Sequence, residues 1–267
     1  MDLSRREFVA SMSTLPVMPS LSPAKMLIID AHVHAGHGTG ITHESSTFLD
    51  PELTLARMAD GGIDRSIIFP CDNYEYEKPN QEIAEYCHRY APKFIGYAKH
   101  DPVTEKGRIA AMLKHEVNEL GLRGLKLHVH PNREILDAVA ELGVPIIYHP
   151  PKTVADFHMI ARTYPQVNFI IAQLGNWSSA DPWEHVAAID IARRYPNVYT
   201  EASGVQARTY LEMAAKEIPD KLMFGSDGPE TDCRVELYKI RSLKLPPQQE
   251  AQVLGGNMMR ILPKGTL

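Results

Sequence analysis

The stretch Met26-Leu-Ile-Ile-Asp-Ala-His-Val-His-Ala-Gly36 joins a short apolar run to a polar end. The apolar run is typical of a buried strand, and it leads into Asp30, His32 and His34. Side chains two residues apart on a strand point to the same face, so these three groups are expected to lie together. Two imidazoles at this spacing can bind one metal ion, or they can be solvated residues at a strand end. A metal site would need further ligands from elsewhere in the chain.

Apolar runs of the same kind recur along the chain and alternate with segments of helical periodicity. The runs predicted as strands are residues 27–31, 65–70, 94–98, 122–129, 144–148, 167–172, 198–202 and 221–225. The segments predicted as helices are residues 53–59, 83–87, 109–120, 135–142, 153–163, 183–194, 207–217 and 247–262. Strands that alternate with helices indicate a parallel sheet, because each crossover must carry a helix.

Eight such units predict an α/β fold of the (β/α)₈ TIM-barrel type, with residues 26–267 as a single domain. A doubly wound open sheet is the alternative. The first predicted strand is not followed by a Gly-x-Gly-x-x-Gly motif, which weighs against that alternative.

Catalytic residues of such a barrel lie at the carboxyl ends of the strands. Polar residues are concentrated at these positions, and the candidates are His32, His34, His100, Lys126, His128, His130, His149, Gln173, Glu201, Ser203 and Asp227. A site of three histidines and one carboxylate can be drawn from this set: His32, His34, His149 and Asp227. Nitrogen and oxygen donors in this mixture suit Zn²⁺ or Mn²⁺.

The composition excludes several other classes of protein. The 267 residues carry a net charge of −5 and no basic patch, so we expect no nucleic-acid partner. No apolar run reaches the roughly 18 residues that cross a membrane, and we expect no membrane partner. The three cysteines have no Cys-x-x-Cys spacing and predict neither a disulfide framework nor a zinc ribbon. The expected partner is a small-molecule substrate, and the composition is compatible with a homo-oligomer.

Residues 1–25 are predicted to be a twin-arginine signal peptide. Arg5 and Arg6 are followed by Phe8 and Val9, then by a mildly apolar stretch and the small-residue sequence 22–24. Two prolines interrupt that apolar stretch, so a disordered start of a cytoplasmic protein is the alternative. The twin-arginine route exports folded proteins with their cofactors loaded, and we expect a periplasmic location.

Five motifs and a tail resemble those of the amidohydrolase superfamily, in its branch of amidohydrolase-related, metal-dependent hydrolases and decarboxylases. They are residues 29–34, 124–128, 146–149, 169–175 and 224–229, with the tail at 254–262. Together they cover essentially all of 26–262 in the family's order. The resemblance implies one divalent metal ion, zinc before manganese, held by His32, His34 and His149. It also implies that Asp227 serves as a ligand and proton acceptor.

The chain departs from the family pattern at Gln173, where relatives usually carry a histidine that polarises the substrate or assists proton transfer. Glutamine can donate a hydrogen bond but cannot titrate. His128 or His130 could take over that role, because histidine is the usual general base near neutral pH. In binuclear relatives a carboxylated lysine, here Lys126, bridges two metals. A second metal would lack ligands in this chain, so one metal is expected.

The leading hypothesis is metal-assisted hydrolysis of a small ester, lactone or amide, with Asp227 as the general base. Lys126, His130 or Gln173 could stabilise the developing oxyanion. The positions expected to support the ligands or contact the substrate are Asp30, Lys126, His100 and Ser203. The alternatives are non-oxidative decarboxylation of an aromatic or unsaturated carboxylic acid, and a barrel that has lost catalysis and only binds a ligand.

Overall fold

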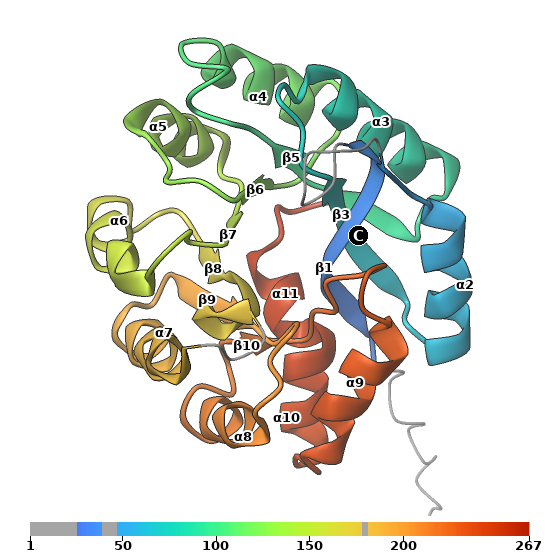
Figure 1. Ribbon diagram of the computed structural model, residues 1–267, viewed down its shortest axis with the longest axis vertical. Coiled ribbons are helices and arrows are strands. Elements are labelled where there is room, and N and C mark those ends of the chain that lie inside the picture. The colour runs from blue at the N-terminus through green and yellow to red at the C-terminus, as the bar shows by residue number, and fades with distance from the viewer. Residues whose placement is uncertain (1–25, 39–46, 178–180, 267) are drawn as a thin grey trace, which may run out of the picture.

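A computed structural model of the protein describes residues 26–38, 47–177 and 181–266, and the predicted signal peptide lies outside these ranges. Parallel strands form a central ring with helices around it (Figure 1). The ring strands are β1 (Ile29–Gly38), β3 (Arg65–Pro70), β4 (Phe94–Gly96), β5 (Ala98–Lys99), β6 (Leu125–Leu127), β7 (Ile146–Tyr148), β8 (Phe169–Ile171), β9 (Val198–Glu201) and β10 (Leu222–Met223). Only Tyr97 separates β4 from β5, so these strands fill eight positions.

Two sheets contain the strands of the ring, with strand orders β2-β1-β3-β4, in which β2 is Thr47–Leu49, and β10-β9-β8-β7-β6-β5. Backbone hydrogen bonds cross both seams between them. At one seam Tyr97 N donates to Ile68 O at 2.9 Å. At the other, Ala31 N donates to Phe224 O at 3.0 Å, and Asp227 N donates to His32 O at 2.8 Å. The second seam places β1, the first strand of the ring, against β10 and the segment that follows it.

Helices follow the strands on the outside of the ring. They are α2 (Pro51–Gly61), α3 (Glu77–Arg89), α4 (Ile109–Asn118), α5 (Arg133–Leu142), α6 (Phe157–Thr163), α7 (Pro182–Arg194), α8 (Arg208–Glu217) and α9 (Cys233–Ser242). Helix α9 was not predicted from its periodicity, because the buried Glu236 interrupts its apolar face. In the described part of the chain, no helix has the length and apolar character needed to cross a bilayer.

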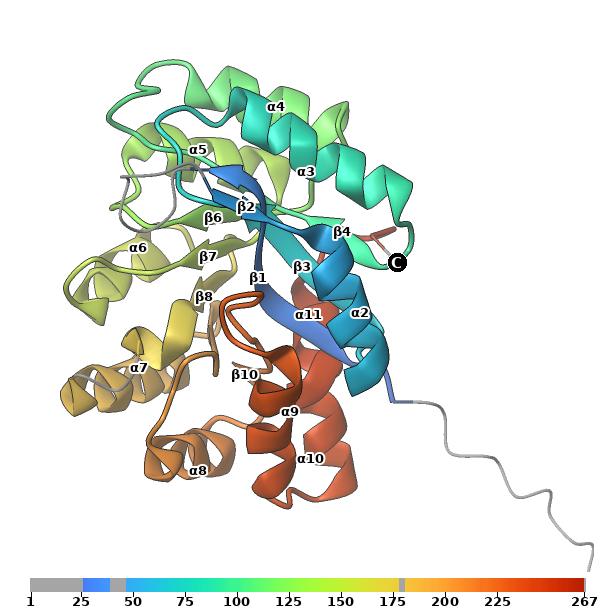
Figure 2. The same cartoon turned by 45° about the vertical axis from the view of Figure 1, so that its right-hand side comes forward.

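One strand and several turns also differ from the prediction. Strand β2 (Thr47–Leu49) pairs antiparallel with the far end of β1, where Gly36 faces Leu49 (Figure 2). The predicted helix over 247–262 is divided into α10 (Pro247–Ala251), the π-helical turn η4 (Gln252–Gly256) and α11 (Asn257–Ile261). Short 3₁₀ turns, η1 (Val154–Asp156) and η2 (Ala172–Gly175), follow β7 and β8.

The inside of the ring is apolar at one end and polar at the other. Alternate residues of the strands form an inner apolar cluster, closed by residues of α11: Ile29, Ala31, Ile67, Phe69, Ile95, Tyr97, Ile147, Ile170, Ala172, Tyr199, Met223, Met258, Ile261 and Leu262. Helix α11 lies in the centre of the ring in Figure 1. Met258 and Ile261 of α11 are part of this apolar cluster, whereas the polar residues that end the strands lie at the carboxyl end.

Close packing at Gly255 holds the last turns against β1. A methyl group there would overlap the Leu27 carbonyl oxygen, whereas a methyl group at Gly256 would have the Ala251 carbonyl oxygen as its nearest neighbour, 3.3 Å away. We expect Gly255→Ala to lower the free energy of unfolding by roughly 2 kcal/mol or more through overpacking. Gly256→Ala should be neutral or slightly stabilising. Urea denaturation of both variants measures this, and equal effects would show that the contact is unimportant.

Candidate metal and catalytic site

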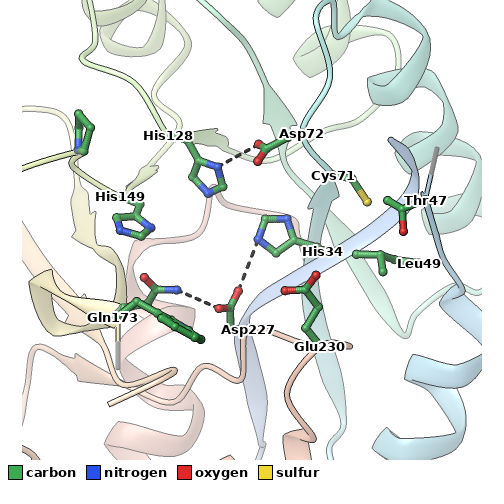
Figure 3. A pocket seen from close by; sticks show the side chains of 12 residues that line it. His34, Thr47, Leu49, Cys71, Asp72, His128, His149, Gln173, Asp227 and Glu230 are labelled. Carbon is green, nitrogen blue, oxygen red and sulfur yellow. Dashed lines mark hydrogen bonds and ion pairs between the residues drawn. The ribbon is translucent and has the colours of Figure 1, made fainter. Parts of the chain in front are cut away.

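A cavity of about 400 Å³ opens at the carboxyl ends of the strands. Its walls come from β1, β2 and η2 and from the segments that follow β3, β6, β7 and β10 (Figure 3). The lining residues are His34, Thr47, Leu49, Cys71, Asp72, His128, His149, Pro151, Gln173, Trp177, Asp227 and Glu230. This volume is typical of a small-molecule site.

Three predicted ligands converge at the floor of the cavity. The Nε2 atoms of His32 and His34 lie 3.2 Å and 3.5 Å from Oδ1 of Asp227. The ligand atoms of these three residues lie within 4.8 Å of one another. Strand β1 brings both histidines to one face, and the seam with β10 brings Asp227 to them. Two imidazoles and a carboxylate are a donor set that fits a divalent metal ion.

The far side of His32 is held by a buried carboxylate. Its Nδ1 lies 2.9 Å from Oε1 of Glu201, which also accepts hydrogen bonds from Gln173 N at 2.5 Å and Ser203 Oγ at 3.1 Å. A carboxylate behind a histidine fixes the ring and its tautomer, as in many metal sites. Burial and Lys126 would lower the pKa of His32, but Asp227 and Glu201 outweigh them and raise it. Ser203 therefore supports Glu201 and does not line the cavity.

Asp227 is ionised and fixed from several directions. Burial opposes its charge, but His32 and His34 hold the pKa of its carboxyl well below the usual range. Its backbone is left-handed, with φ of 60°. Its Oδ2 accepts a hydrogen bond of 2.9 Å from Nε2 of Gln173. Both carboxylate oxygens are therefore oriented before any ligand binds.

Gln173 is itself constrained, with a φ of 57° and a side chain that is 3% exposed. An ionised carboxylate only accepts hydrogen bonds, so the amide nitrogen must face Asp227. The amide oxygen Oε1 is then left buried, without a hydrogen-bond partner among the described residues. Sequence reasoning expected this side chain to act as a donor to the substrate. Instead, one N–H of its amide donates to Asp227, and the group without a partner is the amide oxygen Oε1, which is an acceptor.

Lys126 lies beside the ligand group. It projects from β6 into the ring, 3.2 Å from Nε2 of His32, with its amine 5.0 Å from the centre of the Phe69 ring. Burial lowers the pKa of Lys126 to about 7. The amine can therefore be neutral near physiological pH, which reduces its repulsion of a cation at this position.

A second polar group lines the opposite wall of the cavity. Nδ1 of His128 lies 3.0 Å from Oδ1 of Asp72, and Lys99 forms a short ion pair with the same oxygen. Burial would raise the pKa of Asp72, but His128 and Lys99 hold it well below its usual range. Burial and then Lys99 lower the pKa of His128, so its ring is neutral at pH 7.

His149 lines the cavity next to His128, with ring centres 5.6 Å apart. Burial, followed by Lys126, lowers its pKa to about 4, so its imidazole is neutral and free to bind a metal. It is not part of the group of ligand atoms within 4.8 Å. Its role as a ligand stays a prediction.

Two predicted site residues, the catalytic candidate His130 and the supporting candidate His100, lie outside the cavity. His130 is more than half exposed and lies 2.6 Å from Asp156. Strand β6 ends at Leu127, so the alternation expected to carry His130 inward stops before it. His100 points away from the cavity, because Lys99 takes the inward position on β5; its two ring nitrogens lie 2.9 Å and 2.8 Å from Glu105 and Glu116. Neither histidine lines the cavity.

Asp30 supports the seam between β1 and β10. Its Oδ1 accepts hydrogen bonds from His32 N at 3.2 Å and from Ser226 N at 2.9 Å. It is fully buried, and burial raises its pKa to about 7. Its contribution is to hold the two strands whose ends carry the ligands.

Glu201 was a candidate without an assigned role, and Lys99 was not among the candidates. Lys99 ends β5 and Glu201 ends β9. By the period-two alternation Glu201 shares a face with the candidate Ser203, whereas Lys99 faces opposite to its neighbour His100. Asp72 and Glu230 lie on loops, where no periodicity indicates which way a side chain points.

The chain matches the amidohydrolase family model over residues 29–264, and it belongs to that family, whose members are metal-dependent. Similar solved structures include an amidohydrolase from Burkholderia multivorans with bound HEPES, at 17% identity and a TM-score of 0.72 over 89% of this chain and 100% of that one. Among curated protein sequences, none matches this chain significantly.

Two decarboxylases also share the fold. The 5-carboxyvanillate decarboxylase of Sphingomonas paucimobilis has 15% identity and a TM-score of 0.69, over 88% of this chain and 98% of that one. A dihydroxybenzoic acid decarboxylase of a Polaromonas species, with bound manganese and 2-nitroresorcinol, has 15% identity and a TM-score of 0.67, over 88% and 96%. These likenesses confirm the TIM-barrel fold, and the family match confirms the predicted family.

The His100 cluster predicts a pH dependence of stability. Burial would lower the pKa of His100, but Glu105 and Glu116 raise it to about 9, above the roughly 6.5 of an unfolded chain. The positive charge of His100 therefore raises the free energy of unfolding by on the order of 3 kcal/mol at pH values below 6.5. This contribution is lost as the pH rises through 9. The difference in unfolding free energy between wild type and His100→Gln should shrink between pH 6 and 9.5.

Chemical denaturation across that pH range provides the measurement. His115→Gln, at an exposed histidine beside Glu119, is the matched control and should show a small difference at every pH. A His100→Gln effect that stays constant from pH 6 to 9.5 would contradict the buried charge.

Proposed function

We propose that the protein hydrolyses a small, uncharged or amine-bearing ester, lactone or amide with the help of one divalent metal ion, zinc or manganese. The observation that carries this proposal is the convergence of His32, His34 and Asp227 at the floor of a cavity whose opposite wall holds His128 and Asp72. The first group can bind a cation, and the second can move a proton.

His32, His34 and Asp227 would hold the metal, and His149 could complete the set. When bound, the ion supplies Lewis-acid activation of a water molecule and of the scissile carbonyl. Glu201 keeps His32 in the tautomer that leaves Nε2 available. Gln173 keeps Asp227 from rotating, because the carboxylate is tied through Oδ2.

Proton movement is assigned to two residues. Asp227 is ionised and lines the cavity, so it can accept a proton from the attacking water. The ionised Asp72 accepts a hydrogen bond from the Nδ1–H group of His128, so Nε2 of the neutral ring is an acceptor. His128 can then receive at Nε2 the proton that Asp227 accepted and deliver it to the leaving group, while Lys99 keeps Asp72 charged.

The charge of the cavity wall favours hydrolysis over decarboxylation. The lining includes the carboxylates of Asp72, Asp227 and Glu230, and none of the described lining residues is an arginine or lysine. A carboxylic acid substrate would meet there the negative charge of Glu230, which is unpaired among the described residues, whereas a neutral carbonyl compound would not be repelled. Gln173 also cannot protonate the carbon atom from which CO₂ departs.

Metal removal tests the proposal. We expect about one equivalent of zinc or manganese by mass spectrometry, and a loss of 4-nitrophenyl acetate hydrolysis of at least ~100-fold after chelation. Either ion should restore the activity. His34→Ala should lose the metal, and His88→Ala, at an exposed histidine on α3, should keep it.

Three results would overturn this reading. Undiminished ester, lactone and amide hydrolysis by the metal-free protein would remove the role of the metal. Release of CO₂ from a panel of aromatic acids, without hydrolysis of any ester, lactone or amide, would instead establish decarboxylation. A protein that binds metal but catalyses neither reaction would be a ligand-binding barrel.

Mutation can distinguish the roles of the two histidines that follow β6, His128 and His130. His128→Gln should lower kcat roughly 10²-fold or more with unchanged metal content, because proton transfer is lost. His130→Gln should stay within about twofold, because His130 lies beside Asp156 outside the cavity. Steady-state kinetics on the metal-loaded variants measures both. A larger effect at His130 would mean that the proton route differs from the one drawn here.

A further inference from the structure

The buried carbonyl of Gln173 is an unused acceptor in the cavity. Its Oε1 has no hydrogen-bond partner among the described residues, and the side chain is 3% exposed. It cannot exchange places with the amide nitrogen, because Nε2 donates to Asp227. A buried polar atom without a partner is destabilising, and such atoms are rare in folded proteins. Its position on the cavity wall points to a ligand that brings an N–H or O–H group.

Glu230 is a second unused acceptor on the same wall. In Figure 3 its carboxylate is directed toward His34, and Asp227 lies between Glu230 and Gln173. Glu230 forms no hydrogen bond or ion pair with any residue in the described ranges. Partial burial, together with the charges of Asp227 and Asp72, raises its pKa. A positive charge brought beside it would relieve both effects.

The other carboxylates of the cavity already have partners. Asp72 is paired with Lys99 and His128, and Asp227 faces His32 and His34. Among the lining carboxylates, Glu230 is therefore the one whose negative charge has no partner in the described part of the protein and is available to a ligand. Trp177 lines the same cavity and is 52% exposed, and an indole ring also attracts cations.

We propose that the substrate carries a protonated amino group, which is bound by the Glu230 carboxylate and has the Gln173 carbonyl as a neutral acceptor nearby. The identification of this ligand as a substrate rests on the proposed hydrolysis. The ammonium site itself does not, because it can be occupied without turnover. The substrate class is thus an amine-bearing ester, lactone or amide.

Binding of two probes tests the site without catalysis. Hexylammonium and hexan-1-ol have the same chain, and only the first is charged. In the metal-loaded protein, Glu230→Gln should weaken hexylammonium binding by roughly fivefold or more and change hexan-1-ol binding less than about twofold. Titration calorimetry measures both. Glu141→Gln makes the same charge change at the exposed end of α5 and should alter neither.

Kinetics with a matched pair of esters completes the test. Wild type should prefer 4-nitrophenyl 6-aminohexanoate to 4-nitrophenyl heptanoate in kcat/KM, and Glu230→Gln should remove that preference mainly through KM. Hexylammonium binding that is insensitive to Glu230→Gln would overturn the ammonium site even if both esters are hydrolysed. Charge-selective binding with hydrolysis of neither ester would support the ammonium site and count against the proposed hydrolysis.

Discussion

The pairing of β1 with the segment that follows β10 is the constraint on which the site depends. Ser226 N donates to Asp30 Oδ1 across a sequence separation of 196 residues, and Asp227 N donates to His32 O beside it. These bonds bring a carboxylate from the end of the chain to two histidines from its beginning. The donor set therefore exists only when the ring of strands is complete, so metal affinity and folding should be thermodynamically linked.

The carboxyl end of the ring is a compact electrostatic unit built above an apolar floor. Lys126, Lys99 and the site histidines are balanced by Glu201, Asp72 and Asp227, all within a few ångströms of their partners. Burial strengthens these interactions and also makes any unpaired member costly. This explains why Gln173 Oε1, a buried acceptor without a partner among the described residues, stands out on the cavity wall.

The fold and much of the donor set were predictable, because both follow from local periodicity. Alternation along β1 placed His32 and His34 on one face, and the strand–helix alternation indicated the barrel. Errors arose where a periodicity stops or changes phase. The short β6 ends before His130, and β5 turns Lys99 inward in place of His100. The orientation of the Gln173 amide depends on Asp227, far away in sequence, and no local pattern carries that information.

Left-handed backbone conformations are gathered around the site. Gln173, Leu174 and Asp227 have φ values of 57°, 49° and 60°, which residues with a side chain rarely adopt. The hydrogen bond from Gln173 N to Glu201 helps hold one of these conformations in place. A glycine at position 173 would relax the backbone, yet it would also remove the amide that orients Asp227. The backbone conformation that residue 173 would prefer is thus in conflict with the alignment of the Asp227 carboxylate. The packing of the surrounding barrel compensates for the strain of the left-handed backbone.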